Sequence, residues 1–166
     1  MITIDEIKTM LALQPHPEGG YFAETYRAGE SIPSTTLPSR YSSARSHGTA
    51  IYYLLTPDTC STLHRLKSDE IFHFYLGDPV EMLQLHPDGT GERLTLGTEL
   101  LQGMQPQVLV PQGVWQGARL IPGGDFALLG CTVAPGFSYE DFEVGGRENL
   151  LAAYPEFKTL IRALTR

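Results

Sequence analysis

The sequence predicts an all-β domain, a sandwich or a barrel, with short α-helices at the N- and C-terminal ends of the chain. Many short β-like runs follow one another, turn signals separate them, and no helical segment lies between them. Strands in this number without interleaved helices predict a sandwich or barrel rather than a parallel α/β sheet. The 166 residues, 42% of them hydrophobic, can bury one core, so we expect a single domain over 1–166.

The N-terminal segment predicts a short amphipathic helix followed by a strand. Thr3-Ile4-Asp5-Glu6 fits a capping box, and the apolar side chains that follow recur on one helical face. PHPEGG (15–20) is a rigid turn signal, and GYFAETYR (20–27) alternates large and polar residues as a strand does. His16 and Glu18 of this turn either cap a cavity or only decorate a backbone corner, and the sequence leaves both interpretations open.

Residues 29–48 predict a long irregular loop. The segment is polar, rich in serine and proline, and has no hydrophobic period. Loops of this length inside small domains are lids, binding loops or disordered segments, and a tolerated surface insertion is the plainer alternative.

The remainder predicts the β core and a C-terminal helical tail. Turn signals such as GDP, PDGTG and PGGD separate the runs. In the tail, residues 149–165 place leucine, isoleucine and phenylalanine at helical spacings around Pro155. The β-like runs are residues 49–55, 62–66, 70–76, 80–86, 92–97, 107–111, 114–120 and 126–134.

Charge and composition exclude several classes of partner. Nineteen acidic and twelve basic residues give a net charge of −7, which opposes binding to nucleic acid. No apolar run is long enough to span a bilayer and the N-terminus does not resemble a leader, so we expect a cytoplasmic protein without membrane contact. Cys60 and Cys131 are too few and too far apart to predict a disulfide framework, and two buried thiols are expected.

Two motifs resemble those of the cupin superfamily. HRLKSDEIFHFYLG (64–77) is similar to the first motif, HxH…E…G, with His64 and Glu70 matching and Leu66 in place of the second histidine. PQGVWQ (111–116) is similar to the second motif, PxGxxH, with Gln116 in place of the histidine. Longer strings at 15–27, 64–81, 106–118 and 130–144 resemble the small single-domain cupin_5 family of unknown function. The resemblance implies a double-stranded β-helix, or jelly-roll barrel, with a ligand-sized cavity and a homodimeric assembly.

A more distant resemblance is to dTDP-4-dehydrorhamnose 3,5-epimerases, which are metal-independent cupins. GGYFAETYR is similar to their early strand, on which a glutamate helps to hold the nucleotide sugar, and the resemblance places Glu24 there. It also places a catalytic histidine at His64. Those enzymes need a tyrosine acid on a late strand, which FALLGCTVA lacks, and Tyr139 is not assumed to replace it.

The cupin positions offer two strong metal ligands and one weak ligand. Imidazoles and a carboxylate make a stable shell, but His64, Glu70 and the amide of Gln116 are marginal for a transition metal. We therefore expect no cofactor, with a divalent metal on these three residues as the alternative. Strand alternation turns His73 to the face opposite Glu70.

Acid–base chemistry without a metal is the leading interpretation. A histidine can exchange protons near neutral pH, and a neighbouring carboxylate can orient it. We expect His64 and Glu70 to be the catalytic residues, with His64 as the base. The alternative is an ion pair of Glu70 with Arg65 or Lys67.

Further residues are expected to bind the ligand. Arginine offers paired donors to a phosphate or carboxylate, and aromatic rings stack on a sugar or base. Trp115 is expected at the mouth of the barrel because it lies inside the second motif. The expected ligand-binding residues are Glu24, Arg27, Tyr52, Arg65, Phe72, Trp115 and Gln116.

The sequence thus leaves three functions open. The first is a cupin that binds a small polar ligand, sugar-like or nucleotide-linked, and isomerises or epimerises it by acid–base chemistry. The second is a metal-dependent enzyme that uses His64, Glu70 and Gln116. The third is a non-catalytic module that binds a small molecule.

Overall fold

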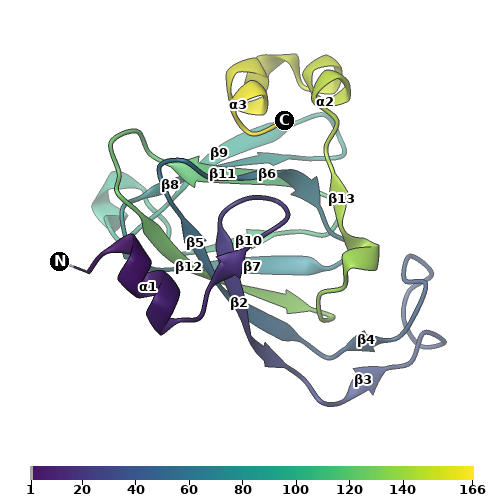
Figure 1. Cartoon of the computed structure of the whole chain (residues 1–166). Coiled ribbons are helices and arrows are strands. Elements are labelled where there is room, and N and C mark those ends of the chain that lie inside the picture. Colours follow the sequence, from purple (N-terminus) through teal and green to yellow (C-terminus); the bar gives the residue numbers. More distant parts are fainter. Residues whose placement is uncertain (1) are drawn as a thin grey trace.

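The structure, a computed structural model, describes residues 2–166 and contains two antiparallel sheets that face each other. Short helices lie outside the sheets, α1 at one end of the chain and α2 and α3 at the other (Figure 1). The predicted all-β architecture with short flanking helices is confirmed. Within residues 2–166, no helix is long and apolar enough to cross a membrane.

The larger sheet has six strands in the order β1-β2-β5-β12-β7-β10. In this sheet β12, from the last predicted β-like run, lies between β5, from the first, and β7, because it pairs with both. The strands are β1 (Gln14–Pro15), β2 (Tyr21–Arg27), β5 (Thr49–Leu55), β12 (Ala127–Ala134), β7 (Asp69–Gly77) and β10 (Gln107–Val110).

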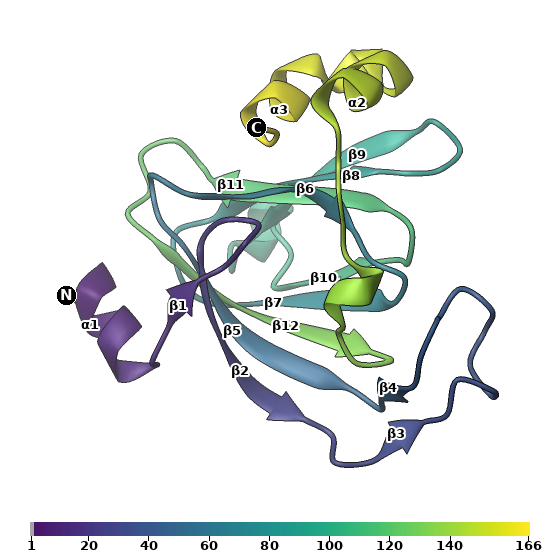
Figure 2. The same ribbon diagram turned by 45° about the vertical axis from the view of Figure 1, so that its right-hand side comes forward.

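The smaller sheet has five strands in the order β13-β6-β11-β8-β9. Chain segments cross repeatedly between the two sheets, as in a jelly roll. After β12, the chain leaves the six-stranded sheet and crosses the open end of the barrel to reach the other sheet (Figures 1 and 2). The strands are β13 (Glu143–Val144), β6 (Cys60–Arg65), β11 (Trp115–Leu120), β8 (Val80–Leu85) and β9 (Gly91–Leu96).

Most of the predicted loop over residues 29–48 is irregular, as expected. Two short strands, β3 (Ser31–Ile32) and β4 (Arg45–Ser46), pair with each other at its base. The 3₁₀ helices are η1 (Leu100–Gln102), η2 (Tyr139–Asp141) and η3 (Pro155–Phe157).

Each helix covers the outer face of one sheet. Helix α1 (Ile4–Met10) begins with the predicted capping box and packs Ile7 against Leu54 and Leu128 of the six-stranded sheet. The predicted C-terminal helical segment is two helices, α2 (Arg147–Ala153) and α3 (Lys158–Ala163), with η3 starting at Pro155 between them. They bury a second apolar cluster on the five-stranded sheet, which includes Leu63 and Leu83.

The main core lies between the sheets and fills only part of the barrel. Inward-facing side chains of both sheets, among them Tyr53, Phe72, Met82 and Leu129, form one buried cluster. The other part of the barrel, between β2, β5, β6 and the segment after β12, is hollow and is lined by both polar and apolar side chains. This hollow end of the barrel is the candidate site.

Candidate functional site

A cavity of about 400 Å³ opens at the end of the barrel that the segment after β12 crosses. Its size is within the range of small-molecule sites, roughly 300–1,000 Å³. Its walls come from the turn before β2, from β2, β5, β6, β7 and β12, and from two segments outside the main sheets, residues 43–46 and 137–139. The lining residues are His16, Glu18, Phe22, Glu24, Arg27, Ser43, Ala44, Arg45, Ser46, Thr49, Ile51, His64, Leu66, Glu70, Cys131, Val133, Phe137, Ser138 and Tyr139.

The turn before β2 carries Glu18 into the cavity. Gly19 and Gly20 have φ angles of 111° and 72°, a backbone conformation that glycine adopts without strain. A Cβ atom at Gly19 would overlap the carbonyl oxygen of Cys60, so the turn also needs glycine for its close approach to β6. Thr62 anchors the turn by donating its backbone N–H and its hydroxyl to the carbonyl oxygen of Glu18, at 3.0 and 2.9 Å.

Glu18 and His64 form a buried pair. The Oε2 atom of Glu18 lies 3.1 Å from the Nε2 atom of His64. The Nδ1 atom of His64 is 2.7 Å from the carbonyl oxygen of Thr62, which can only accept, so Nδ1 carries a proton and donates it there. Nε2 therefore faces the carboxyl group of Glu18. Ser61 donates its hydroxyl to the other carboxyl oxygen at 3.2 Å.

Burial sets the protonation of this pair. It raises the pKa of Glu18 from 4.5 to about 8, and it lowers the pKa of His64 below its ordinary value. Near neutral pH the uncharged forms of both groups are therefore favoured, and one proton lies between Oε2 and Nε2. The pair is an acid that can release this proton into the cavity.

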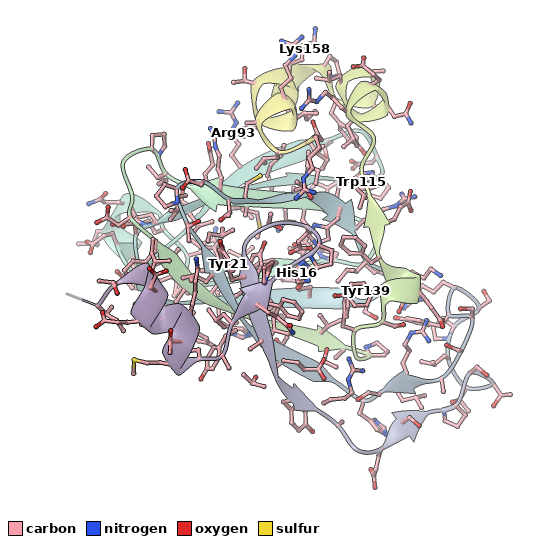
Figure 3. The ribbon with its side chains drawn as sticks, in the orientation of Figure 1. His16, Tyr21, Arg93, Trp115, Tyr139 and Lys158 are labelled. Carbon is pink, nitrogen blue, oxygen red and sulfur yellow. The ribbon has the colours of Figure 1, made fainter. Side chains whose placement is uncertain are left out.

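His16 supports the turn from the side. Its Nδ1 atom accepts the backbone N–H of Glu18 at 3.1 Å, and its ring packs edge-on against Phe22. Burial, followed by the charge on His64, lowers the pKa of His16 to about 4. His16 is therefore neutral at physiological pH, and it points toward the interior of the barrel (Figure 3).

Glu70 is a second buried carboxyl group in the cavity. Gln116 donates its amide Nε2 to the Oε2 atom of Glu70 at 2.6 Å. Burial raises the pKa of Glu70 to about 7, so both its charged and uncharged forms are populated near neutral pH. Over the described residues 2–166, the Oε1 atom of Gln116 is the one buried side-chain nitrogen or oxygen atom with no hydrogen-bond partner.

These residues do not fit the metal shell that the cupin motifs imply. Leu66 lines the cavity with a hydrocarbon side chain, and Gln116 turns a nitrogen that cannot ligate toward Glu70. The Nε2 atom of His64 faces Glu18. In the part of the chain that the structure describes, no group of three or more His, Cys, Asp or Glu side chains is arranged to hold a metal ion.

Four of the predicted site residues line the cavity, namely His64, Glu70, Glu24 and Arg27. His64 and Glu70 both line the cavity, as predicted. The side chain in contact with His64 is that of Glu18, however, and the one in contact with Glu70 is that of Gln116. Gln116 reaches the site through this bond.

The other predicted ligand-binding residues do not line this cavity. Phe72 is part of the main core, and Tyr52 lies on the outer face of β5 beside α1. Trp115 packs beside the C-terminal helices, away from the cavity (Figure 3), and its ring lies under the guanidinium of Arg65. Arg65 itself pairs with Glu143 at 2.8 Å. Tyr52, Arg65 and Trp115 are each one position from an inward-facing residue, and a shift of one residue turns a side chain to the other face of a sheet. Phe72 does face the interior, but it lies where the core fills the barrel.

His73 faces away from the cavity, as strand alternation predicts. Its Nε2 atom lies 3.0 Å from the hydroxyl of Thr132 on β12. Cys60 and Cys131 are both free thiols, as expected, but the expectation that both are buried is wrong for Cys60. Cys131 is buried and lines the cavity, whereas Cys60 is partly exposed and lies among the side chains below α3.

The sequence left the roles of His16 and Glu18 open, and the expected ligand-binding residues did not include Arg45, Phe137 or Tyr139. The only local signal was PHPEGG, whose two glycines indicate a fixed turn but not what the turn approaches. The contact with β6 joins residues more than 40 positions apart, so only the fold reveals it.

The comparisons with known proteins agree with this architecture. Residues 5–145 match the family model described as Cupin superfamily (DUF985). The chain belongs to this family of cupins. An uncharacterized protein of Saccharomyces cerevisiae is 32% identical to this cupin over 135 residues, which cover 76% of this chain and 67% of the yeast protein.

Solved structures share the whole fold of this cupin. A protein of Shewanella oneidensis has a TM-score of 0.88 at 35% identity, covering 100% of this chain and 99% of its own. A hypothetical protein of Leishmania major has a TM-score of 0.88 at 30% identity, with 99% of each chain covered. Oxalate decarboxylase of Bacillus subtilis has a TM-score of 0.53 at 16% identity over 90% of this chain and 36% of its own, a likeness of fold alone.

Proposed function

We infer that this cupin binds a small, sugar-like ligand in the cavity and isomerises or epimerises it by proton transfer. The observation that supports this proposal is the Glu18–His64 pair, which holds one proton in a cavity shared with Glu70. Proton-transfer chemistry needs a general acid and a general base, and two groups of different proton affinity in one enclosed site can fill these roles.

The proposed reaction moves a proton beside a carbonyl group of the ligand. The Glu70 carboxylate takes the proton from the carbon next to the carbonyl, and that C–H bond breaks. The proton held between Glu18 and His64 passes to the carbonyl oxygen, which leaves an enediol and a Glu18 carboxylate beside neutral His64. Both protons then return, one to carbon and one to the pair, so that no oxidant or reductant is consumed.

The order of proton affinities supports these roles. Burial raises the pKa of Glu70 to about 7, so its carboxylate is present at neutral pH, whereas burial raises the pKa of Glu18 further, to about 8, so Glu18 keeps its proton. A base that is already ionised and an acid that is still protonated must coexist for this transfer to begin. In this arrangement His64 acts with Glu18, and Gln116 orients Glu70.

Deuterium exchange tests the proposal without knowledge of the exact product. The protein is incubated in D₂O with a panel of aldoses, ketoses and keto sugars, and deuterium on carbon is read by mass spectrometry and NMR. We expect incorporation next to the carbonyl of at least one sugar. Glu18→Gln, which keeps a donor toward His64 but cannot release a proton, should lose about 100-fold or more of the rate, as should Glu70→Gln.

The matched control is His86→Gln, compared with His64→Gln. His86 directly follows β8, where the turn to β9 begins, and pairs with exposed Glu92, outside the cavity. Loss of exchange in His64→Gln with normal exchange in His86→Gln supports the assignment. Equal rates in both variants would overturn it.

The same experiment separates the other two functions. Sugars that raise the melting temperature but never exchange deuterium would indicate a binding module. Exchange that EDTA abolishes and a single divalent metal restores would indicate the metal-dependent alternative. Either result would contradict the proposed mechanism.

A further inference from the structure

The two arginines that line the cavity are both bound to carboxylates of the protein itself. Arg45 donates its Nε and Nη2 to the two carboxyl oxygens of Asp141, both at 2.7 Å, and it also lies 3.3 Å from Glu140. Arg27 donates its Nε and Nη2 to the two oxygens of Glu24, at 2.9 and 2.8 Å. Each guanidinium thus presents to a protein carboxylate the paired edge that would otherwise receive a phosphate.

The pairing of Arg27 with Glu24 depends on a local feature of β2. Residues three apart on a regular strand point to opposite faces. The register of β2 against β5 shifts between Glu24 and Tyr26, which is a β-bulge. Because the bulge inserts one extra residue, Glu24 and Arg27 reach the same side and meet at the cavity.

Arg27 is also tied to the segment that crosses the open end of the barrel. Its Nη1 and Nη2 atoms both lie 3.2 Å from the carbonyl oxygen of Phe137. Four of its contacts are therefore made within the protein. A ligand anion that recruited Arg27 would have to displace both Glu24 and this carbonyl.

The deeper part of the cavity has no positively charged side chain that could pair with an anion at neutral pH. Its ionisable groups are the Glu18–His64 pair, Glu70, His16 and the thiol of Cys131, and all of them are buried or partly buried. Of these, only the histidines can become positive, and burial lowers the pKa of both. An anionic group placed there would face carboxyl groups and lose its hydration without a cationic partner.

We propose that Glu24 is a specificity-determining residue, which neutralises Arg27 and restricts the cavity to ligands without a phosphate or carboxylate group. This proposal rests on the proposed function and defines its substrate class as uncharged, hydroxyl-rich molecules such as free sugars, rather than sugar phosphates or nucleotide sugars. Hydroxyl groups suit the site because they can donate to its carboxyl oxygens and accept from Ser138 and Tyr139, which also line it.

The test is a gain of phosphate binding when Arg27 is released. Inorganic phosphate is titrated into ¹⁵N-labelled wild-type protein and the Glu24→Gln variant, and the amide signals of residues at the cavity, including Phe137, are followed by NMR. In wild-type protein we expect phosphate to leave these signals unchanged or to bind only very weakly. In Glu24→Gln we expect shifts at Arg27 and Phe137 and affinity about tenfold or more higher, because a charge-assisted bond to one arginine becomes available.

Glu143→Gln is the matched control. It releases Arg65 from a similar exposed pair, at 2.8 Å, on a surface outside the cavity. We expect phosphate to perturb signals near Arg65 in this variant and to leave Phe137 unchanged. The Glu24–Arg27 pair is itself exposed, so its removal should cost little stability and Glu24→Gln should fold.

Three results would overturn the inference. Wild-type protein that binds phosphate at the cavity as tightly as Glu24→Gln would show that Glu24 does not exclude it. No phosphate binding in Glu24→Gln would show that Glu24 is not what limits the site, and an equal response in Glu143→Gln would show that the effect is not local. The proposed function fails by a different observation, the absence of deuterium exchange with neutral sugars, so the two failures are distinguishable.

Discussion

Glu18 is held in place by backbone contacts, and its side chain is free to act on His64. Thr62 fixes its carbonyl oxygen, Gly19 allows the close approach to β6, and Ser61 holds one oxygen of its carboxyl group. A carboxyl group buried in this way keeps its proton to a higher pH than a solvated one. The chemistry of the site therefore depends on how one side chain is desolvated.

The protonation of Glu18 should be visible in the pH dependence of stability. Burial raises its pKa from 4.5 to about 8, so between these values the folded protein holds a proton that the unfolded chain releases. The stability that this proton supports is fully present below pH 4.5 and is lost as the pH rises through about 8. We therefore expect the free energy of unfolding of wild-type protein to fall with pH across this window relative to Glu18→Gln, measured by urea denaturation.

Subtracting the free energy of unfolding of Glu18→Gln from that of wild type removes the contributions of His16 and Glu70 to the pH dependence. The lowered pKa of His16 acts in the opposite direction, between about 4 and 6.5, and is common to both proteins. Glu70 acts in the same direction as Glu18 and is also common. In the control variant Glu99→Gln, changed at an exposed residue, the curve of unfolding free energy against pH should run parallel to that of wild type. A curve for Glu18→Gln that is also parallel to wild type would contradict the assignment.

Leu66 and Gln116 stand where the cupin motifs have metal-ligating histidines. Replacing both with histidine should therefore create a metal site. In Leu66→His/Gln116→His, three histidines and Glu70 face the same interior, a donor set that suits a transition metal. We expect the double variant to bind about one equivalent of Zn²⁺ or Ni²⁺ with at least about tenfold higher affinity than wild type. Plasma mass spectrometry after dialysis measures the content.

A single substitution outside the cavity is the control for the double histidine variant. Leu109→His adds an imidazole at an exposed position on β10, outside the cavity, and should retain no more metal than wild type. If untreated wild-type protein already carried a full equivalent of one transition metal, the interpretation of Leu66 and Gln116 would be wrong.

At the scale of elements, two segments outside the main sheets frame the mouth of the cavity and are joined by one buried ion pair. Residues 43–46, from the end of the long loop, and residues 137–139, from the segment after β12, both line the cavity. Arg45 and Asp141 link them, and Ser42 and Ser43 add bonds to Glu140 at 3.0 and 2.8 Å. The predicted 29–48 loop is thus part of the site at its C-terminal end.

Breaking this ion pair on one side should destabilise both segments. Arg45→Met leaves Asp141 buried with only Lys67, 3.8 Å away, and we expect a loss of about 3 kcal/mol in the free energy of unfolding. Hydrogen exchange should increase in residues 41–46 and 137–142. The double variant Arg45→Met/Asp141→Leu should lose less than Arg45→Met, because no unpaired charge stays buried.

The comparison variant is Arg65→Met, which removes an exposed pair and should cost about 1 kcal/mol or less. Urea denaturation gives all three free energies. A loss in Arg45→Met no larger than in Arg65→Met would show that burial of the Arg45–Asp141 pair does not matter to stability.

At the scale of the whole molecule, the sheets share one interior, and each carries helices on its outer face. Strands β6 and β8 contribute both to the apolar cluster under α2 and α3 and to the interior of the barrel, through neighbouring residues such as Met82 and Leu83. Because the same strands connect the clusters, we predict that residues 1–166 unfold as one domain.

Two probes can test this cooperativity. Trp115 is the single tryptophan of the chain and lies beside the C-terminal helices, so its fluorescence reports on that side, whereas far-UV circular dichroism reports on both sheets. We expect both signals to change at the same urea concentration. A separate, earlier fluorescence transition would show that the C-terminal helices unfold independently.

The homodimer that the family resemblance implies stays a prediction. Unfolding of a dimer to separated chains depends on protein concentration by mass action. We expect the urea midpoint to rise with protein concentration and sedimentation equilibrium to give twice the mass of one chain. A midpoint independent of concentration together with the mass of one chain would contradict the dimer.

The sequence by itself determined the class of fold and placed two residues of the candidate site, His64 and Glu70, together. Period-two strands, turn residues and the capping box are local signals, and they predicted α1 and the longer strands to within a few residues, but not the two-residue strands β1, β3, β4 and β13. The motif around His64 and Glu70 predicted that these two side chains share one interior, and they do.

Only the tertiary structure decided which groups surround these two residues. The contacts of Glu18 with Thr62 and His64, and of Arg45 with Asp141, join positions more than 40 and about 95 residues apart. Trp115 faces the C-terminal helices because of the register of β11, which a motif does not show. Burial, and with it the proton on Glu18, is a property of how many segments close around a side chain, and no local pattern of residues encodes it.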